Sequence, residues 1–279
     1  MCECEIVRVL LPIFPSSHLP IFPSSQFPSF PVSQFPSFPV SQFPSFPSSH
    51  LLIFSSSNLV NMQQIIIVGS GGHGAELSDY IKYNEKITGT KEFEIIGFLD
   101  DNPANYANYK FEAPLIGGVR DHVVRTDVEY LMGIANLTYR KLFVERYTKD
   151  GAKFISLIHH TAYISDSATL GTGVVIGPMV NLGPNSVIGD YTLLNSRCSM
   201  GHDTKVGKFN FISPNVCFSG FTEIGDENLF GINSATIPMI KVGNRNKVMA
   251  GMVLDKNVGD DEVVFYRFKE KIIAIPKQA

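Results

Sequence analysis

The sequence lacks a strong charge of either sign. Its 23 Lys and Arg residues nearly balance 26 Asp and Glu residues, which leaves a formal net charge of −3 at pH 7. Nucleic-acid binding needs clustered basic residues, so we expect no nucleic-acid partner. The 279 residues are enough for one or two domains, each with a core of its own.

Cysteine is scarce as well. The four cysteines are Cys2, Cys4, Cys198 and Cys217, and no two of them form a CxxC pair. This usage suits a reducing compartment and no disulfide framework, so we expect a cytoplasmic protein whose cysteines are small buried thiols.

Long apolar runs are also missing. No run approaches the ~20 residues that a membrane-spanning helix needs. The apolar start from Val7 to Phe14 is short and broken by Pro12, and Glu3 and Glu5 stand where a signal peptide has basic residues. We therefore expect neither a membrane span nor a secretory leader.

A tandem octapeptide rich in Pro, Ser and Phe fills most of residues 1–61. It reads IFPSSQFP from Ile21 and SFPVSQFP from Ser29 and Ser37, and no charged residue occurs between Arg8 and Glu76. Proline at this density prevents both helix and sheet. The segment is predicted to be disordered or PPII-like.

Three interpretations of residues 1–61 stay open at this point. The segment is a Pro-rich docking arm, an extension without a role in the chemistry, or an artefact of start-site choice. Met62 directly precedes the first strand-like run, and we favour the hypothesis that it is the true start. Intact mass of the protein from its native host tests this, and finding residues 1–61 present would refute it.

Residues 62–157 are predicted to form a small Rossmann-like α/β domain. Residues 65–68 are a continuous apolar run, as in a buried parallel strand. A glycine-rich turn and an amphipathic stretch follow. Residues 93–99 are predicted as a second strand that ends at Asp100 and Asp101, and residues 130–134 as a third.

A period of six residues dominates the remainder. A large apolar residue occupies the same place in each of sixteen hexads from Ile164 to Leu254, with Thr236 as the one exception, and glycine often follows it. One apolar residue per hexad would fill the axis of a β-helix, and glycine would let the chain turn tightly beside it. We expect a parallel β-helix over residues 158–258 and a C-terminal cap or tail over residues 259–279.

These hexads resemble those of the hexapeptide-repeat acyltransferases, whose fold is a left-handed β-helix with three hexads per coil. Together with the motifs GSGGHG from Gly69 and FLDD from Phe98, the chain resembles the sialic-acid O-acetyltransferase and UDP-4-amino-sugar N-acetyltransferase group. The resemblance covers residues 62 to about 257. It implies acetyl-CoA as co-substrate, a nucleotide-linked sugar as acceptor and a homotrimer with active sites between adjacent β-helices.

One histidine lies inside the repeats, His202, and Asp203 follows it. Its place two residues after Met200 predicts an outward side chain. Acetyl transfer to an amine needs a base near neutral pH, which a histidine can be, and a carboxylate can hold its tautomer. The resemblance gives this pair the catalytic role. The alternatives are a surface histidine in a turn and a zinc ligand, although zinc needs three or four ligands and we expect no metal.

Further positions are carried over from the resemblance alone. It implies sugar binding by Asn195, an oxyanion-hole role for the backbone N–H of Gly220, and acetyl-CoA binding by Ile232, Ala250, Gly251 and Lys256. Two departures stand out. Phe211 occupies the place of a second family histidine, and the C-terminal tail differs from the family's short closing motif.

The glycine-rich turn, Gly69-x-Gly71-x-x-Gly74, stands between strand and helix. Such a turn lets the backbone close on a pyrophosphate at a helix N-terminus. The chain before the hexads is too short for a six-stranded NAD domain, and a nucleotide sugar fits the turn as well. The resemblance implies that the nucleotide contacts Gly72, His73, Gly74, Asp100 and Asp101. A tight turn that holds no ligand is the alternative.

The expected function is transfer of acetyl from acetyl-CoA to the amino group of a nucleotide-linked sugar, in glycan or surface polysaccharide synthesis. O-acetylation of sialic acid or another sugar hydroxyl stays open, because the same histidine can activate a hydroxyl. A non-catalytic scaffold or sugar sensor is a third possibility. A γ-type carbonic anhydrase is disfavoured because its metal-binding histidines are missing.

Overall fold

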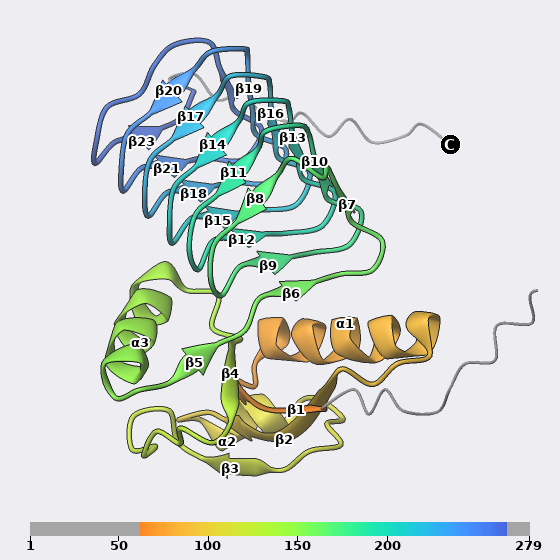
Figure 1. Ribbon diagram of the computed structural model, residues 1–279. Helices are drawn as coiled ribbons and strands as arrows, with labels where there is room; N and C mark the ends of the chain where they lie inside the picture. The colour runs from red at the N-terminus through yellow and green to blue at the C-terminus, as the bar shows by residue number, and fades with distance from the viewer. Residues whose placement is uncertain (1–61, 267–279) are drawn as a thin grey trace, which may run out of the picture. The chain divides into compact units, whose positions relative to one another are not determined.

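The computed structural model describes residues 62–266. The predictions for residues 1–61, for the start at Met62 and for most of the C-terminal tail lie outside these residues. The described chain forms an α/β domain followed by a long stack of coils (Figure 1). Within residues 62–266, no helix has both the length and the apolar character that crossing a bilayer requires.

The α/β domain contains one five-stranded sheet. Its elements are β1 (Gln63–Val68), α1 (Gly72–Thr88), β2 (Phe93–Leu99), α2 (Pro103–Ala107), β3 (Leu115–Gly117), β4 (Glu129–Met132), α3 (Leu137–Lys149) and β5 (Lys153–Phe154). All strands are parallel, in the order β3-β2-β1-β4-β5. The strand order reverses between β1 and β4, and such a reversal opens a crevice at the carboxyl ends of the strands.

The structure confirms the strand at residues 93–99 and corrects the third one. The strand predicted over residues 130–134 is β4, which already ends at Met132, because the next segment packs against the glycine-rich turn. Four elements were not predicted: α2, β3, α3 and β5. Helix α3 lacks a clear apolar stripe, since one of its buried residues is Arg140, but Asn136 marks its start by accepting a hydrogen bond from the Tyr139 N–H at 3.2 Å.

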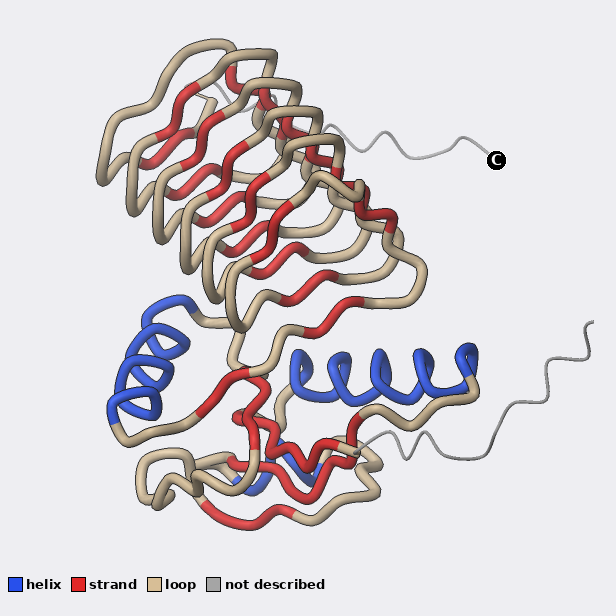
Figure 2. Tube along the Cα trace, viewed as in Figure 1, coloured by secondary structure: helices blue, strands red, loops and turns tan. Residues whose placement is uncertain are grey.

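The second part is a parallel β-helix of two-residue strands. Each coil contributes one strand to each of three sheets, here called faces 1, 2 and 3 in chain order, and the strands form three rows along the stack (Figure 2). Strands in adjacent coils pair 18 residues apart, as Asn181 does with Ser199. This spacing confirms three hexads per coil.

The strand bounds follow the hexads closely. Face 1 contains β6 (Leu157–Ile158), β9 (Val175–Ile176), β12 (Leu193–Leu194), β15 (Phe211–Ile212), β18 (Leu229–Phe230), β21 (Lys247–Val248) and β23 (Val263–Val264). Face 2 contains β7 (Tyr163–Ile164), β10 (Asn181–Leu182), β13 (Ser199–Met200), β16 (Cys217–Phe218), β19 (Ala235–Thr236) and β22 (Val253–Leu254). Face 3 contains β8 (Thr169–Leu170), β11 (Val187–Ile188), β14 (Lys205–Val206), β17 (Glu223–Ile224) and β20 (Lys241–Val242).

The periodic apolar residues fill the axis of the β-helix as predicted. The exception, Thr236, is also inward and only 4% exposed. Its hydroxyl accepts a hydrogen bond from the Ser219 N–H at 3.2 Å and lies 2.9 Å from the hydroxyl of Thr222. A threonine is tolerated here because its polar atom has buried partners.

The expected reason for the hexad glycines was wrong. The residue that turns, with φ near +60°, comes two positions later and is not glycine at Asn185 (φ 58°) or Asp203 (φ 58°). The glycines instead allow the coils to stack closely. A Cβ at Gly183 would lie 2.9 Å from the backbone N of His202, and one at Gly231 would lie 2.5 Å from the backbone N of Ala250.

A ladder of buried side-chain amides joins successive coils. The side-chain oxygen of Asn228 accepts a hydrogen bond from the Asn246 N–H at 2.8 Å, and its Nδ2 donates to the Gly243 carbonyl at 2.9 Å. Asn210 makes the equivalent bonds one coil earlier. These amides satisfy backbone groups that the turns leave without partners.

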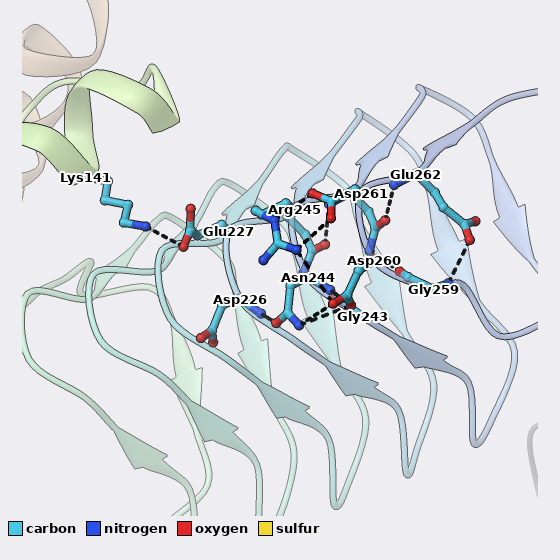
Figure 3. A network of polar contacts seen from close by, with 12 residues as sticks. Lys141, Asp226, Glu227, Gly243, Asn244, Arg245, Gly259, Asp260, Asp261 and Glu262 are labelled. Atoms are coloured by element: carbon cyan, nitrogen blue, oxygen red, sulfur yellow. Dashed lines mark hydrogen bonds and ion pairs between the residues drawn. The ribbon is translucent and has the colours of Figure 1, made fainter.

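The α/β domain packs on face 1 of the β-helix. Outward residues of β6, β9 and β12 are buried in one cluster with Ile65 and Ile67 of β1 and with Leu77 of α1. Lys141 of α3 also contacts the β-helix, since its Nζ lies 2.7 Å from Glu227 Oε1. This ion pair lies beside a network of polar contacts around Arg245 and Asp261 (Figure 3). The first coils of face 1 are therefore covered by the α/β domain of the same chain.

Candidate active site

A crevice of about 310 Å³ lies at the reversal of strand order. It is bounded by loops that follow the carboxyl ends of β1, β2 and β4, as expected for an open parallel sheet. Its lining residues are Gly69, Asp100, Asp101, Asn102, Asn105, Val119, Arg120, Ile134, Tyr139 and Phe143. Of these residues, the sequence singled out Gly69, in the glycine-rich turn, and Asp100 and Asp101, as nucleotide contacts. It did not single out Arg120 or Tyr139.

The two predicted carboxylates differ in their surroundings. Asp100 Oδ2 accepts hydrogen bonds from the N–H and hydroxyl of Ser70 at 2.8 and 3.0 Å, and its Oδ1 accepts from the Asn102 N–H at 2.9 Å and from Asn105 Nδ2 at 3.1 Å. Asp101 is paired with Arg120, whose Nε lies 3.4 Å away. Asp100 thus shapes the loop, while Asp101 and Arg120 present charge to the crevice.

The glycine-rich turn is packed tightly against the sheet. A Cβ at Gly74 would collide with the carbonyl oxygen of Gly69, and one at Gly69 (φ +101°) would lie 2.9 Å from Ile134 Cγ1. Gly71 caps α1 without a side-chain hydrogen bond to the first turn. The turn therefore leaves the N-terminal N–H groups of α1 available to an anion.

The side chain of His73 is largely buried. Its side chain is 9% exposed, and Nδ1 lies 3.3 Å from Glu76 Oε2. Burial lowers the pKa of His73 below its ordinary value, more than the contact with Glu76 raises it. Neither His73 nor its neighbours Gly72 and Gly74 line the crevice directly.

His202 lies on the corner of the β-helix between faces 2 and 3. Its Nδ1 is 2.8 Å from Asp203 Oδ2, and its side chain is 57% exposed. Hydrogen bonds from His202 and then from Asn185 hold the pKa of Asp203 below its ordinary value. With Nδ1–H donated to the carboxylate, Nε2 is the ring nitrogen free to accept a proton.

Gly220 lies one coil beyond His202 and directly against its ring. A Cβ at Gly220 would lie 2.8 Å from His202 Nε2 and 2.9 Å from Cε1. The ring also contacts Phe221 edge-on, with centroids 5.0 Å apart. Among the described residues, the N–H of Gly220 makes no backbone or side-chain hydrogen bond. A donor without a partner beside a base is the arrangement that an oxyanion requires.

The other carried-over residues fall on two corners. Lys256 follows the inward Leu254 in the column of His202 and Gly220, three coils further on, which is about 14 Å at the usual strand spacing. Asn195, Ile232, Ala250 and Gly251 lie instead on the corner between faces 1 and 2. One protomer therefore brings together His202, Asp203 and Gly220 but separates them from that second group by the width of face 2.

Phe211 does not lie near His202. It belongs to β15 on face 1 and packs against the apolar cluster that joins the two domains. Phe211, which the resemblance put in the place of a second histidine, is therefore a residue of the domain junction. In residues 62–266, no group of three or more His, Cys, Asp or Glu side chains could hold a metal ion.

The first domain is similar to a known protein family. The model of the PglD N-terminal domain matches residues 64–147. UDP-N-acetylbacillosamine N-acetyltransferase of Bacillus subtilis is 31% identical over 117 residues, which are 41% of this chain and 51% of that protein. The matched part is thus about half the length of this curated relative.

Solved structures match over more of the chain. The acetyltransferase domain of PglB from Neisseria gonorrhoeae, in complex with acetyl coenzyme A, has a TM-score of 0.63 at 25% identity, covering 72% of this chain and 95% of that one. Perosamine N-acetyltransferase from Caulobacter crescentus, in complex with CoA and GDP-perosamine, has a TM-score of 0.62 at 20% identity, covering 72% and 92%.

The chain shares its two-domain fold with these acetyltransferase structures. The expected fold, a Rossmann-like domain followed by a left-handed parallel β-helix, is confirmed. WeeI from Acinetobacter baumannii shares it, with a TM-score of 0.60 at 20% identity over 72% of this chain and 96% of that one.

Proposed function

We propose that this chain transfers acetyl from acetyl-CoA to the amino group of a nucleotide-linked amino sugar, in glycan or surface polysaccharide synthesis. The observation that carries the proposal is the His202–Asp203 pair beside the unpartnered N–H of Gly220, in a chain that also has a charged crevice at the strand-order reversal. The 25% identity with an acetyl coenzyme A complex supports the choice of cofactor. The cysteine usage is consistent with a cytoplasmic location.

The chemistry follows from the position of each group. His202 Nε2 accepts a proton as the amine nitrogen of the sugar attacks the thioester carbonyl carbon. The carbonyl oxygen becomes an oxyanion, which the Gly220 N–H stabilises. The C–S bond then breaks, the CoA thiolate leaves, and the amide forms. Asp203 holds the tautomer of His202 and stabilises the imidazolium.

The site is incomplete within one protomer. The α/β domain packs on the first coils of face 1, and His202 lies on the corner between faces 2 and 3, which is opposite face 1 in a three-sided coil. The α/β domain of one protomer therefore lies on another side of its β-helix than its own His202. We propose that a homotrimer places the crevice of one protomer beside His202 of the next, and that acetyl-CoA lies along the cleft between two β-helices.

Mixing two inactive variants tests this arrangement. His202→Ala removes the base, and Asp101→Ala removes the crevice carboxylate. If the site combines residues of two subunits, trimers reassembled from a 1:1 mixture should recover about one quarter of the sites. Recovery of no activity from such mixed trimers, verified by mass spectrometry, would show that the crevice and the base of one protomer work together.

The acceptor is tested by acetyl transfer to nucleotide-linked amino sugars. We expect CoA release with an amino sugar and none with its hydroxyl counterpart. CoA release with sialic acid or a hydroxyl sugar alone would instead assign O-acetylation. His202→Ala should reduce turnover by about 100-fold to 10,000-fold, the usual contribution of a general base.

A further inference from the structure

Arg140 is a fully buried arginine at the junction of the two domains. It lies in α3 and its side chain is 0% exposed. Its Nη1 donates to the carbonyl oxygens of Met132 at 3.0 Å and Ile134 at 3.2 Å, and its Nε donates to the carbonyl oxygen of Tyr191 at 3.1 Å. One guanidinium thus joins the end of β4 to the β-helix.

No carboxylate of the described residues forms an ion pair with Arg140. Its Nη2 is buried and has no hydrogen-bond partner within residues 62–266. Burial lowers the pKa of Arg140 to about 10, so the side chain remains charged at neutral pH. A buried charge without a counter-ion destabilises a folded protein, and its presence needs an explanation.

Arg140 supports the segment directly behind the glycine-rich turn. Between the two carbonyls that it binds lies Gly133, where a Cβ would lie 2.9 Å from the Gly69 carbonyl oxygen and 3.1 Å from the Gly74 Cα. Hence the segment around Gly133 separates the guanidinium from the glycine-rich turn that would hold an anion. A change at Arg140 moves both the shape of the turn and its electrostatic potential.

A second buried group points to the same place. His73, in the first turn of α1, has a buried Nε2 without a hydrogen-bond partner, and Arg140 is one of the charges that act on it. The first turn of α1 contains no cap hydrogen bond from a side chain. Of the acids in the described part of the chain, Glu76 is the one that faces His73, at 3.3 Å from Nδ1. The helix end and Arg140 therefore both place positive charge beside the turn, where the Asp100 carboxylate holds Ser70.

We propose that Arg140 is a positioning residue for a diphosphate bound at the glycine-rich turn. The negative charge of the diphosphate is the counter-charge that Arg140 lacks. This inference rests on the proposed function and identifies the diphosphate of the nucleotide sugar as the group whose binding offsets the buried charge. Arg140 acts through the turn and through the field. It does not touch the reacting atoms.

Binding measurements separate charge from shape. Isothermal titration with UDP, GDP, inorganic pyrophosphate and uridine would compare the wild type with Arg140→Gln, which can keep a carbonyl contact but has no charge. We expect Arg140→Gln to weaken binding of the diphosphates by at least about tenfold, the scale of one charge-assisted interaction, and to change uridine binding less than twofold. Arg140→Lys keeps the charge and should restore most of the diphosphate affinity.

A matched control lies on the same helix. Lys149→Gln removes one exposed positive charge from the end of α3 and should leave all four affinities within twofold. Equal losses for uridine and UDP in Arg140→Gln, or no loss for either, would refute the inference without affecting the proposed acetyl transfer. If Arg140→Gln does not fold, Arg140→Lys takes its place. Unchanged UDP affinity in Arg140→Lys, with a Tm gain on UDP addition like that of the wild type, supports the inference. A tenfold loss of UDP affinity in Arg140→Lys refutes it. Wild-type protein that binds no diphosphate would contradict both the inference and the proposed acceptor.

Discussion

The contact between His202 and Gly220 can be tested by adding one methyl group. In Gly220→Ala the new Cβ would lie 2.8 Å from His202 Nε2, whereas ordinary contacts begin at 3.4 Å. The imidazole must therefore shift by about 0.6 Å or more, against a hydrogen bond of 2.8 Å to Asp203. Gly220 does not have a left-handed backbone conformation, so alanine is compatible with the main chain.

We expect a selective loss of turnover. A misplacement of about 1 Å in a catalytic group typically costs about 100-fold in rate, so kcat of Gly220→Ala should fall by about 10-fold to 100-fold. Tm should stay equal or rise slightly, because alanine reduces the entropy of the unfolded chain. The assay is release of CoA thiol from acetyl-CoA with an amino-sugar acceptor, alongside thermal unfolding.

The His202→Ala background provides the control. Without the imidazole, the new methyl group has no ring to displace, and Gly220→Ala should change the residual activity less than twofold. An equally large loss in both backgrounds would show that the methyl group obstructs the acetyl-CoA site or the oxyanion instead, and would refute the proposed contact. A large drop in Tm would likewise contradict the reasoning.

Three further predictions concern the ladder, the acid and the domain junction. Asn228→Ala leaves the Asn246 N–H and the Gly243 carbonyl unpaired and should lower the free energy of unfolding, measured in urea, by about 3 kcal/mol. Asn181→Ala, at an exposed position, should change it by less than about 0.5 kcal/mol. Equal effects of the two variants would contradict a structural role for the amide ladder. Hydrogen bonds hold the Asp203 pKa below its ordinary value of 3.8, so the carboxylate is charged above that pH and loses its charge only as the pH falls below it. Asp203→Asn should therefore lower kcat at least about tenfold across pH 6–8. An unchanged kcat would exclude Asp203 from the mechanism. The partly exposed Lys141–Glu227 pair should show a coupling of about 0.5 kcal/mol in a double-mutant cycle of urea unfolding, and a coupling above about 2 kcal/mol would contradict a screened surface pair.

The β-helix could be predicted from sequence because its inward apolar residues recur every six positions. One inward apolar side chain per hexad fixes both the strand and the coil, and Thr236 is accommodated without disturbing the period. The role of the glycines could not be predicted, because a close approach between coils depends on residues 18 positions apart. The turn residues with φ near +60° carry many side-chain types and leave no clear signal.

The candidate site also contains residues that could be predicted from the sequence and residues that could not. His202 was found because it is the one histidine in the repeats, and its contact with Gly220 depends on stacking that the period implies. Arg120, Tyr139 and Arg140 were missed because they belong to β3–α3, where short strands and a helix with a buried arginine give no periodic pattern. The start signal of α3, Asn136, could have revealed that helix.

The central claim is tested most directly by measuring CoA release with acetyl-CoA and a panel of UDP-, dTDP- and GDP-linked amino sugars, for the wild type and His202→Ala in parallel. We predict turnover on an amino sugar that falls at least about 100-fold in His202→Ala, which would also name the nucleotide. Turnover that His202→Ala leaves intact, or silence of the wild type on every amino sugar, would contradict the account.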